Sequence, residues 1–384
     1  MNDPATKPVL VLGGGVAGLT AALALAGNGL PVVLAERQPS LGGHVAGWSC
    51  MATERCLKCS SCLVADLKRD VLGDSRIRTV TRATLGESSR RNGGFQVRLL
   101  PVPPPPGPHA EKPEAPDSGA SAQPAAAMPP EPLPEKPEAP EGETLLAPEE
   151  LAVDSIFLAT GFEPFPAGKK PMLGYGKLEQ VVTTVDLNRV LLEDRVASLP
   201  VAAAADPRVA FLLCVGSRDR EAGREYCSQV CCKTSLRLAA RLLHERPDWQ
   251  ISLFYIDLQV MGKGFREFVR EYSGRIRFLQ GVPGEVLPAA DDQVSLTFES
   301  PAGAVRTETF GLVVLAVGMT PGEDTARLAG SLELAVGSKG FLEATDAAGR
   351  VFAIGACRGP MDIPAARREA LAAVGRYLQA GRNI

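Results

Sequence analysis

A glycine-rich turn near the N-terminus restricts the possible folds more than any other feature of the chain. The stretch "KPVLVLGGGVAGLTAALALAGNGLPVVLAER" predicts a strand, a turn with Gly13, Gly15 and Gly18 in the pattern G-x-G-x-x-G, a helix and a second strand. The first glycine permits the tight turn, the second lets a pyrophosphate approach the backbone, and the third lets the helix pack on the strand. Glu36 ends the second strand, where a carboxylate can accept hydrogen bonds from ribose hydroxyls. The pattern therefore favours a dinucleotide-binding unit over a tight turn without a ligand.

Strand and helix patterns recur further along the chain. The stretches "RVAFLLCVG" and "QISLFYIDL" predict strands that flank the helix "KTSLRLAARLLHER", and "FGLVVLAVG" and "GRVFAIGAC" predict late strands before a closing helix. This alternation predicts an α/β fold with two doubly wound, Rossmann-like domains of the dinucleotide-binding type. The first domain is predicted over 1–100 (with a cysteine-rich loop at 50–62), 151–205 and 336–384, and the second over 206–335.

Residues 101–150 differ in composition from the rest of the chain. They contain 16 of the 32 prolines, no Phe, Tyr or Trp, and the sequence "EKPEAP" twice. Such a segment cannot bury enough apolar surface to offset the entropy of ordering it. We expect a disordered linker that is partly in the polyproline II conformation. The alternative is a docking segment for a proline-binding partner.

Charge and hydropathy exclude several classes of partner. The net charge of −3 and the absence of a basic tail argue against nucleic-acid binding. No apolar run reaches the roughly 20 residues of a membrane span, so we expect no direct membrane insertion. The N-terminal sequence "MNDPATKPVLVLGGG" has no signal-peptide pattern, which predicts a cytoplasmic protein. In that compartment cysteine clusters more often bind metal or perform redox chemistry than form disulfides.

Four of the nine cysteines follow the predicted strand "RVAFLL", where a second nucleotide-binding loop would be expected. They are Cys214, Cys227, Cys231 and Cys232, in the spacing C-x12-C-x3-C-C. Four thiolates can ligate a [4Fe–4S] cluster. Zinc is a poorer match, because zinc ribbons use paired C-x2–4-C knuckles, and structural or redox-active thiols are the third interpretation. The glycine fingerprint is missing here, which argues against a nicotinamide site.

A second group of cysteines lies in "CMATERCLKCSSCLV". Cys50, Cys56, Cys59 and Cys62 have the spacing C-x5-C-x2-C-x2-C, whose last three members copy the start of a bacterial ferredoxin motif. This spacing allows a second [4Fe–4S] cluster. A zinc site, redox-active thiols and a purely structural role are the alternatives.

Several motifs resemble the two-dinucleotide-domain flavoproteins of the glutathione and thioredoxin reductase class. They are the glycine turn with the following "LGG", the "ATG" of "IFLATGFEP", and "GRVFAIGACRGP" before the last helix. The resemblance implies that FAD is bound by the first domain. The residues that it assigns to FAD are Gly13, Gly14, Gly15, Ala17, Gly18, Glu36, Arg37, Leu41, Gly42, Gly43, Ala159, Thr160, Gly161, Gly355, Asp362 and Ile363.

A more specific resemblance covers nearly all of the chain outside 101–150. The stretches "LLCVGSRDREAGREYCSQVCCKTS", "FYIDLQVMGKGFREF", "LVVLAVGMTP" and "GPMDIPAARREALAA" resemble the A subunit of heterodisulfide reductase and its relatives in quinone-interacting oxidoreductases. The resemblance implies that Cys214, Cys227, Cys231 and Cys232 ligate a [4Fe–4S] cluster near FAD, and that nicotinamide binding has been lost. The inserted ferredoxin domain of larger members is replaced by the Pro-rich segment. Arg237 stands where many members have a lysine close to the flavin.

The function expected from these features is electron transfer by an oxidoreductase subunit with FAD and one or two [4Fe–4S] clusters. Its expected partners are redox subunits like the B and C subunits of heterodisulfide reductase, the second flavoprotein of quinone-interacting oxidoreductases, or ferredoxin-type proteins, some of them at a membrane. One alternative is an NAD(P)H-dependent disulfide reductase that uses Cys59 and Cys62. Another is a non-catalytic assembly subunit.

Overall fold

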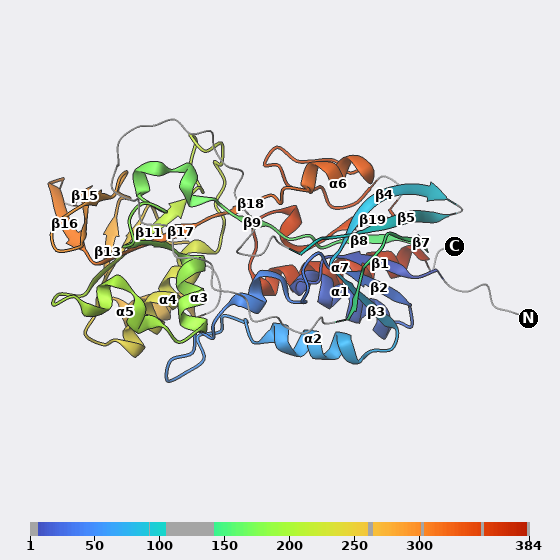
Figure 1. Ribbon diagram of the computed structural model, residues 1–384, viewed down its shortest axis with the longest axis horizontal. Coiled ribbons are helices and arrows are strands. Elements are labelled where there is room, and N and C mark those ends of the chain that lie inside the picture. The colour runs from blue at the N-terminus through green and yellow to red at the C-terminus, as the bar shows by residue number, and fades with distance from the viewer. Residues whose placement is uncertain are drawn as a thin grey trace, which may run out of the picture.

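Two parallel β-sheets, each buried on both faces, organise the chain. The structure is a computed structural model that describes residues 7–91, 93–104, 142–259, 264–300, 303–346 and 349–381. The two sheets form the cores of two lobes that lie side by side (Figure 1). This confirms the α/β class and the two Rossmann-like domains predicted from the sequence. A strand that is buried on both faces needs apolar residues at every position, and the four residues of β1 (Val9–Leu12) are all apolar and buried.

The first sheet has parallel strand pairs throughout. Its order is β19 (Val351–Ala353), β8 (Ile156–Leu158), β1, β2 (Val32–Ala35), β3 (Ile77–Thr81) and β6 (Glu143–Thr144). Val9 and Val11 face the helical layer, whereas Leu10 and Leu12 face the opposite layer. The helical layer consists of α1 (Val16–Gly27), α2 (Leu63–Gly73) and α7 (Ile363–Gly381).

The second sheet repeats this plan. Its order is β10 (Val181–Thr183), β17 (Leu312–Val317), β11 (Arg208–Val215), β12 (Gln250–Tyr255) and β13 (Ile276–Gln280), again with parallel pairs. Apolar residues of α3 (Thr184–Leu192), α4 (Cys231–Glu245) and α5 (Phe265–Tyr272) pack on one face. The helix α3 begins with a capping box in which Thr183 and Asp186 satisfy each other's backbone N–H groups.

The other face of each sheet is covered by strands and not by a second full layer of helices. In the first domain the cover is an antiparallel sheet of β4 (Ala83–Arg91), β5 (Gly94–Pro101) and β7 (Glu149–Val153), with α6 (Thr325–Ser331) beside it. In the second it is formed by β14 (Leu287–Pro288), β15 (Val294–Glu299) and β16 (Val305–Phe310). A layer of helices and a layer of strands can both bury the apolar face of a sheet. The pattern of apolar residues in the sheet strands therefore does not indicate which kind of layer covers them.

The chain crosses between the domains along two short strands that pair with each other. β9 (Glu163–Pro164) leads into the second domain, β18 (Met319–Thr320) returns from it, and the two are antiparallel. Short 3₁₀ helices fill the remaining connections: η1 (Gly43–Gly47), η2 (Ala167–Lys169), η3 (Pro171–Leu173), η4 (Val196–Ser198), η5 (Pro200–Ala203) and η6 (Gly355–Arg358).

The domain boundaries differ from those expected. β10 and α3 belong to the second domain although they precede residue 206, and α6 packs on the first domain although it precedes residue 336. The reason is that β10 completes the edge of the second sheet beside β17. Sequence patterns identify a strand but not the sheet that it joins.

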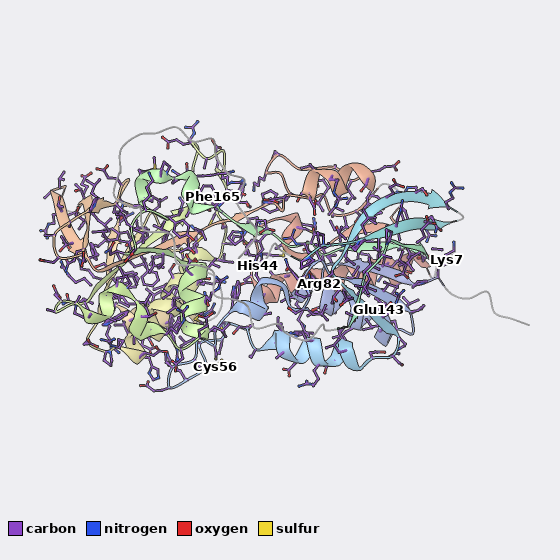
Figure 2. The ribbon with its side chains drawn as sticks, in the orientation of Figure 1. Lys7, His44, Cys56, Arg82, Glu143 and Phe165 are labelled. Carbon is purple, nitrogen blue, oxygen red and sulfur yellow. The ribbon has the colours of Figure 1, made fainter. Side chains whose placement is uncertain are left out.

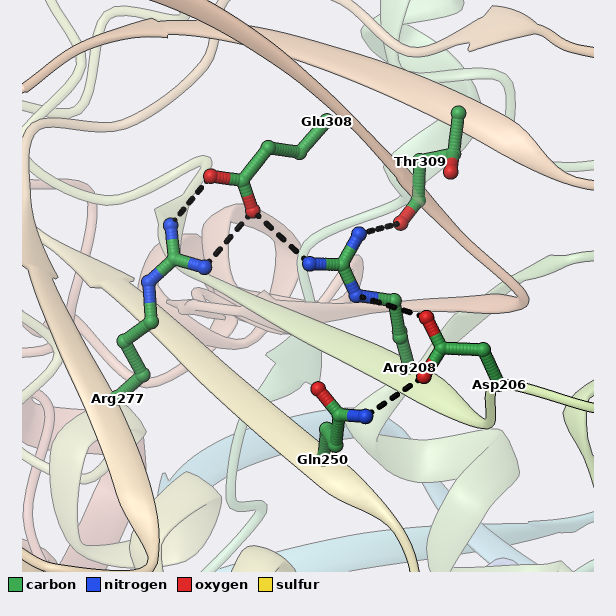
Figure 3. A network of polar contacts seen from close by, with 6 residues as sticks. All are labelled: Asp206, Arg208, Gln250, Arg277, Glu308 and Thr309. Carbon is green, nitrogen blue, oxygen red and sulfur yellow. Dashed lines mark hydrogen bonds and ion pairs between the residues drawn. The ribbon is translucent and has the colours of Figure 1, made fainter.

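An ion-pair network anchors the β14–β16 layer at the amino-terminal edge of the second sheet (Figure 3). Glu308 on β16 accepts hydrogen bonds from both terminal nitrogens of Arg277, at 2.6 and 2.8 Å, and lies 3.5 Å from Arg208. Arg208 also approaches Asp206 at 3.7 Å. These charges lie at the edge opposite to the carboxyl ends of the strands, where ligands of such sheets bind.

Most of the predicted Pro-rich linker, residues 105–141, lies outside the described residues. The prediction was wrong at the two ends of the segment: β5 extends to Pro101, and β6 and the start of β7, at Glu149, lie within 101–150 because they pair with strands of the first domain. Within the part of the chain that the structure describes, no helix has the length and apolar character needed to cross a lipid bilayer.

The glycine turn provides a test of the packing. A Cβ on Gly18 would stand 1.8 Å from the carbonyl oxygen of Gly13, whereas a Cβ on Gly15 would meet no atom within 4 Å. We expect Gly18→Ala to lower the free energy of unfolding by roughly 1–3 kcal/mol, the cost of overpacking. Gly15→Ala should change it by less than about 0.5 kcal/mol. Urea denaturation of the two variants without nucleotide measures the difference, and equal losses would contradict this account.

Candidate functional site

The first part of the site is the turn between β1 and α1. Gly13 has φ +103°, and a Cβ there would lie 2.4 Å from the carbonyl oxygen of Ala159 on the neighbouring strand connection. Gly15 is the N-cap of α1, and a Cβ on Gly15 would point into open space. The turn is therefore closely packed everywhere except at the position where a phosphate would need to approach. The N-terminus of α1 adds free N–H groups and a positive dipole end at the same place, which fits the pyrophosphate of a dinucleotide.

Glu36 is buried beneath this turn. Its Oε2 accepts a hydrogen bond from the backbone N–H of Gly14 at 2.6 Å, and its Oε1 accepts one from Gln38 at 2.8 Å. Burial raises the pKa of Glu36 above its usual value, although these hydrogen bonds act in the opposite direction. The carboxylate thus fixes the shape of the turn. Each carboxylate oxygen keeps a further lone pair that can accept a hydrogen bond from a ribose hydroxyl. The contact with ribose itself stays a prediction.

A second glycine segment packs directly on the first. The Gly42 N–H donates to the Gly14 carbonyl at 2.8 Å, and the fully buried Leu41 side chain closes the space beside Gly14. A Cβ on Gly43 would lie 3.2 Å from the α-carbon of Gly15. The structure therefore brings the "LGG" and "GGG" segments together, and their contact with FAD stays a prediction.

The later segments assigned to FAD join the same region. Ala159 donates to the Leu12 carbonyl at 2.7 Å, which places the following Thr160 and Gly161 beside β1. A Cβ on Gly355 would lie 2.5 Å from the Cβ of Ala17 on α1. These contacts bring the carboxyl ends of β1, β8 and β19 together.

The remaining residues assigned to FAD lie at the ends of helices and at the domain crossing. Asp362 precedes α7, and its Oδ1 accepts a hydrogen bond from the Ala365 N–H at 3.0 Å; the buried Ile363 is the first residue of that helix. Arg37 pairs with Glu163 of β9 at 2.6 Å. Every described residue that was assigned to FAD thus belongs to one edge of the first sheet or its helix ends.

The second part of the site is the group of four cysteines at the end of β11. Cys214 has φ +63°, and the register between β11 and β17 shifts between Leu212 and Val215. A left-handed backbone is unfavourable for a residue with a side chain, and such strain concentrates at functional sites. Cys231 and Cys232 open α4, and residues 216–230 form the connection that carries Cys227.

Buried hydroxyl groups hold this connection in place. The Ser228 N–H donates to Ser217 Oγ at 2.9 Å, Ser217 Oγ donates to the Tyr226 carbonyl at 3.0 Å, and Ser228 Oγ accepts from Met319 N at 2.9 Å. Cys227 lies between these residues, and its sulfur accepts a hydrogen bond from Gln229 N at 3.3 Å. Cys227 is therefore fixed by the surrounding loop rather than by a helix or strand.

The pKa values of three of these cysteines depend on their neighbours in the set. Burial and then the neighbouring cysteines raise the pKa of Cys214 to about 12, and the same causes strongly raise the pKa of Cys231. Burial and Cys227 also raise the pKa of Cys232. Four thiolates cannot be buried together without a positive partner, because both desolvation and mutual repulsion oppose their ionisation. A polynuclear iron centre would supply that charge, so the donor set fits a [4Fe–4S] cluster.

The spacing of the thiols bears on the zinc alternative. A zinc site needs every sulfur within about 2.3 Å of one point. No group of three or more His, Cys, Asp or Glu residues within the described ranges is arranged to hold one metal ion. A four-iron cluster binds each thiolate to a different iron and so needs wider spacing. The preference for a cluster over zinc therefore stays a prediction from the spacing of the four cysteines in the sequence.

Protein side chains pack closely around the turn that follows β11, where a dinucleotide-binding domain would have its phosphate-binding loop. A Cβ on Gly216, which follows β11, would lie 2.0 Å from the ring of the buried Phe165. Phe165 lies where the chain enters the second domain (Figure 2). Arg218 forms an ion pair with Asp257, which lies two residues after the end of β12. A phosphate and a ribose would need to displace these groups, which supports the expected loss of nicotinamide binding.

The N-terminal cysteines lie on the connection between η1 and α2. Cys50, Cys56 and Cys62 are exposed, whereas Cys59 is half-buried and its sulfur lies 3.2 Å from Ser61 Oγ. Partial burial opposes ionisation of Cys59, but hydrogen bonds from Ser61 and Met51 and the charge of Arg237 lower its pKa. The structure does not gather these thiols around a single point among its described residues. A second cluster stays a prediction.

Three contacts of the site were not evident in the sequence. Lys233 pairs with Asp362 at 3.0 Å and so joins the start of α4 to the start of α7. Arg237, expected beside the flavin, instead donates to the carbonyl oxygens of Leu57 and Lys58 at 3.0 and 2.9 Å. The third is the contact of the Phe165 ring with Gly216. In the sequence, only the position of Lys233 next to the C-C pair pointed to the Lys233–Asp362 contact. The contacts of Arg237 and Phe165 had no signal, because they join segments far apart in the chain.

Comparisons with known proteins agree with this geometry. The family model "FAD dependent oxidoreductase" matches residues 8–82, which contain the glycine turn and the "LGG" segment. The chain is 30% identical over 96% of its length to the A subunit of the H2:CoB-CoM heterodisulfide, ferredoxin reductase of Methanothermobacter thermautotrophicus, and covers 63% of that protein. It is also 30% identical over 97% of its length to an iron-sulfur A subunit, numbered 2, of the CoB–CoM heterodisulfide reductase of Methanopyrus kandleri, of which it covers 64%.

Solved structures show the same fold at much lower identity. Thioredoxin reductase from Lactococcus lactis matches with a TM-score of 0.55 and 16% identity, over 97% of this chain and 98% of that one. Bacillithiol disulfide reductase from Bacillus cereus matches with a TM-score of 0.55 and 14% identity, over 98% of this chain and 99% of that one. The chain thus spans less than two thirds of its sequence relatives but the full length of these reductases. By its sequence, its glycine turn and its fold, the chain is thus similar over nearly its whole length to heterodisulfide reductase A subunits, and its residues 8–82 match the FAD-dependent oxidoreductase family.

Proposed function

We propose that this chain is the FAD- and [4Fe–4S]-carrying electron-transfer subunit of a heterodisulfide reductase-like complex. The observation that carries the proposal is the set of four cysteines after the start of β11, two of which open α4, next to a glycine, Gly216, that is covered by the Phe165 ring. When bound, FAD exchanges two electrons and the cluster one at a time, so together they connect two-electron and one-electron chemistry.

The residues of this chain have distinct parts in that function. The β1–α1 turn and the "LGG" segment would hold the dinucleotide, with the open face of Gly15 against its pyrophosphate. Cys214, Cys227, Cys231 and Cys232 would hold the cluster. The Lys233–Asp362 ion pair joins the helix that starts with two of these ligands to α7 of the first domain. It therefore fixes the position of the ligand-bearing helix relative to the flavin-binding domain.

The partners would be further redox subunits. The names of the relatives describe subunits of heterodisulfide reductases, one with ferredoxin as a further reactant. We propose that electrons enter or leave through proteins of the B and C subunit type, the flavoprotein type of quinone-interacting oxidoreductases, or the ferredoxin type. Cys50, Cys56, Cys59 and Cys62 would extend the electron path if they hold a second cluster.

Metal content tests the cluster assignment directly. We expect about four irons per FAD in anaerobically purified protein if one cluster is present, and about eight if both are. Cys231→Ser should remove the electron paramagnetic resonance signal of the cluster at α4. Cys357→Ala is the matched control, because Cys357 is buried in the first domain and donates to the carbonyls of Leu158 and Ile354. Iron-free protein, or a full signal in Cys231→Ser, would contradict the assignment.

Reduction by nicotinamides distinguishes the main alternative. An NAD(P)H-dependent disulfide reductase would bleach its flavin with NADH or NADPH and would need Cys59 and Cys62 for turnover. Because Phe165 covers Gly216 and Arg218 pairs with Asp257 at the turn where a nicotinamide dinucleotide would need to bind, we expect no bleaching by either nicotinamide and full bleaching by dithionite. Absorbance at the flavin band under anaerobic conditions measures this. Rapid bleaching by a nicotinamide would favour the alternative.

A further inference from the structure

The cysteine-rich loop belongs to the first domain in sequence but packs on the second. Residues 48–62 connect η1 to α2, both elements of the first domain. Met51 and Leu57 of this loop are buried in the apolar core formed by α3, α4 and the second sheet, and Cys59 packs against the same core. Figure 2 shows Cys56 of this loop beside the lower edge of the second domain. The loop therefore bridges the two domains at a place distant from the β9–β18 crossing.

Two arginines of α4 hold the backbone of this loop. Arg237 donates from Nε to the Leu57 carbonyl at 3.0 Å and from a terminal nitrogen to the Lys58 carbonyl at 2.9 Å. Arg241, one turn further along α4, donates to the Ala52 carbonyl at 3.1 Å. The planar fork of a guanidinium can bind two carbonyls in fixed geometry, which the single ammonium of lysine cannot do.

The surroundings of Arg237 show that this contact is more than a surface pairing. Its guanidinium is mostly buried, and burial lowers its pKa while Cys59 and Asp362 act in the opposite direction. The loop backbone at this point is left-handed, with φ +52° at Lys58 and +65° at Ser60. A backbone that is unfavourable in isolation needs such partners to persist. Two outer ion pairs, Arg55 with Glu271 and Glu54 with His244, add little to the stability of this attachment because they are exposed.

We propose that residues 48–62 are an interdomain strap and that Arg237 is the positioning residue that fixes the Cys59 end of the strap on α4. Domains joined by small interfaces move relative to one another unless something prevents it. The strap would keep the start of α4, with Cys231 and Cys232, at a constant separation from the flavin-binding domain. This consequence rests on the proposed function, but the strap itself does not.

Hydrogen–deuterium exchange of the full chain as purified tests the proposal. In Arg237→Ala we expect the amides of residues 50–62 to exchange at least about tenfold faster, because the loss of even one hydrogen bond from a charged donor changes an equilibrium by that factor. Arg237→Lys should give an intermediate rate, since an ammonium can reach one carbonyl. Arg237→Met keeps much of the side-chain stem without the donors, and should match the alanine variant.

Arg246→Ala is the matched control. Arg246 follows α4, and within the described residues its side chain contacts the Ala202 carbonyl, Asp248 and the Trp249 ring, all in the second domain, so the loop should exchange at the wild-type rate. Unchanged exchange of residues 50–62 in Arg237→Ala, or full protection in Arg237→Met, would overturn the proposal. Faster exchange in β11 would report general unfolding of the alanine variant. In that case the exchange of residues 50–62 in Arg237→Lys, compared with the wild type, tests the proposal. Iron and FAD contents of the same wild-type sample test the proposed function separately, because the strap needs neither group.

Discussion

The side chains of α4 connect the parts of the candidate redox site. Cys231 and Cys232 open this helix, Lys233 pairs with Asp362 at the start of α7, and Arg237 and Arg241 bind the carbonyls of the cysteine-rich loop. Because these contacts follow one another along one helix, the positions of the thiols, the loop and the flavin-binding domain are linked. The apolar face of α4 is buried on the second sheet, which fixes the helix itself.

The cost of ionising the buried thiols explains why a positively charged iron centre would suit this position. Desolvation and the neighbouring cysteines raise the pKa values of Cys214, Cys231 and Cys232, so the metal-free site favours protonated thiols. Iron would replace those protons and remove the repulsion among thiolates. The same burial excludes water from much of the site, a condition that shifts the reduction potential of a cluster. The N-terminal cysteines differ because three of the four are exposed.

The turn that follows β11 in the second domain differs from a dinucleotide-binding turn in ways that can be traced to particular residues. In a dinucleotide-binding domain the helix begins directly after the glycine turn, with its N–H groups aimed at a phosphate. Here the connection 216–230 separates β11 from α4, and the Phe165 ring contacts Gly216. The carboxyl edge of the sheet thereby carries cysteines in place of a phosphate-binding turn, while the domain keeps its fold.

Local patterns in the sequence determined the strand–turn–helix unit around Gly13, Gly15 and Gly18, the α/β class and the grouping of four cysteines after β11. These features depend on neighbours in the chain, where steric limits on glycine and the alternation of apolar segments leave a clear record. Only the tertiary structure decided that β10 joins the second sheet, that Phe165 covers Gly216 and that Arg237 binds the cysteine-rich loop. Such contacts join segments far apart in the chain, and residue types alone do not specify which distant backbone groups a buried side chain will meet.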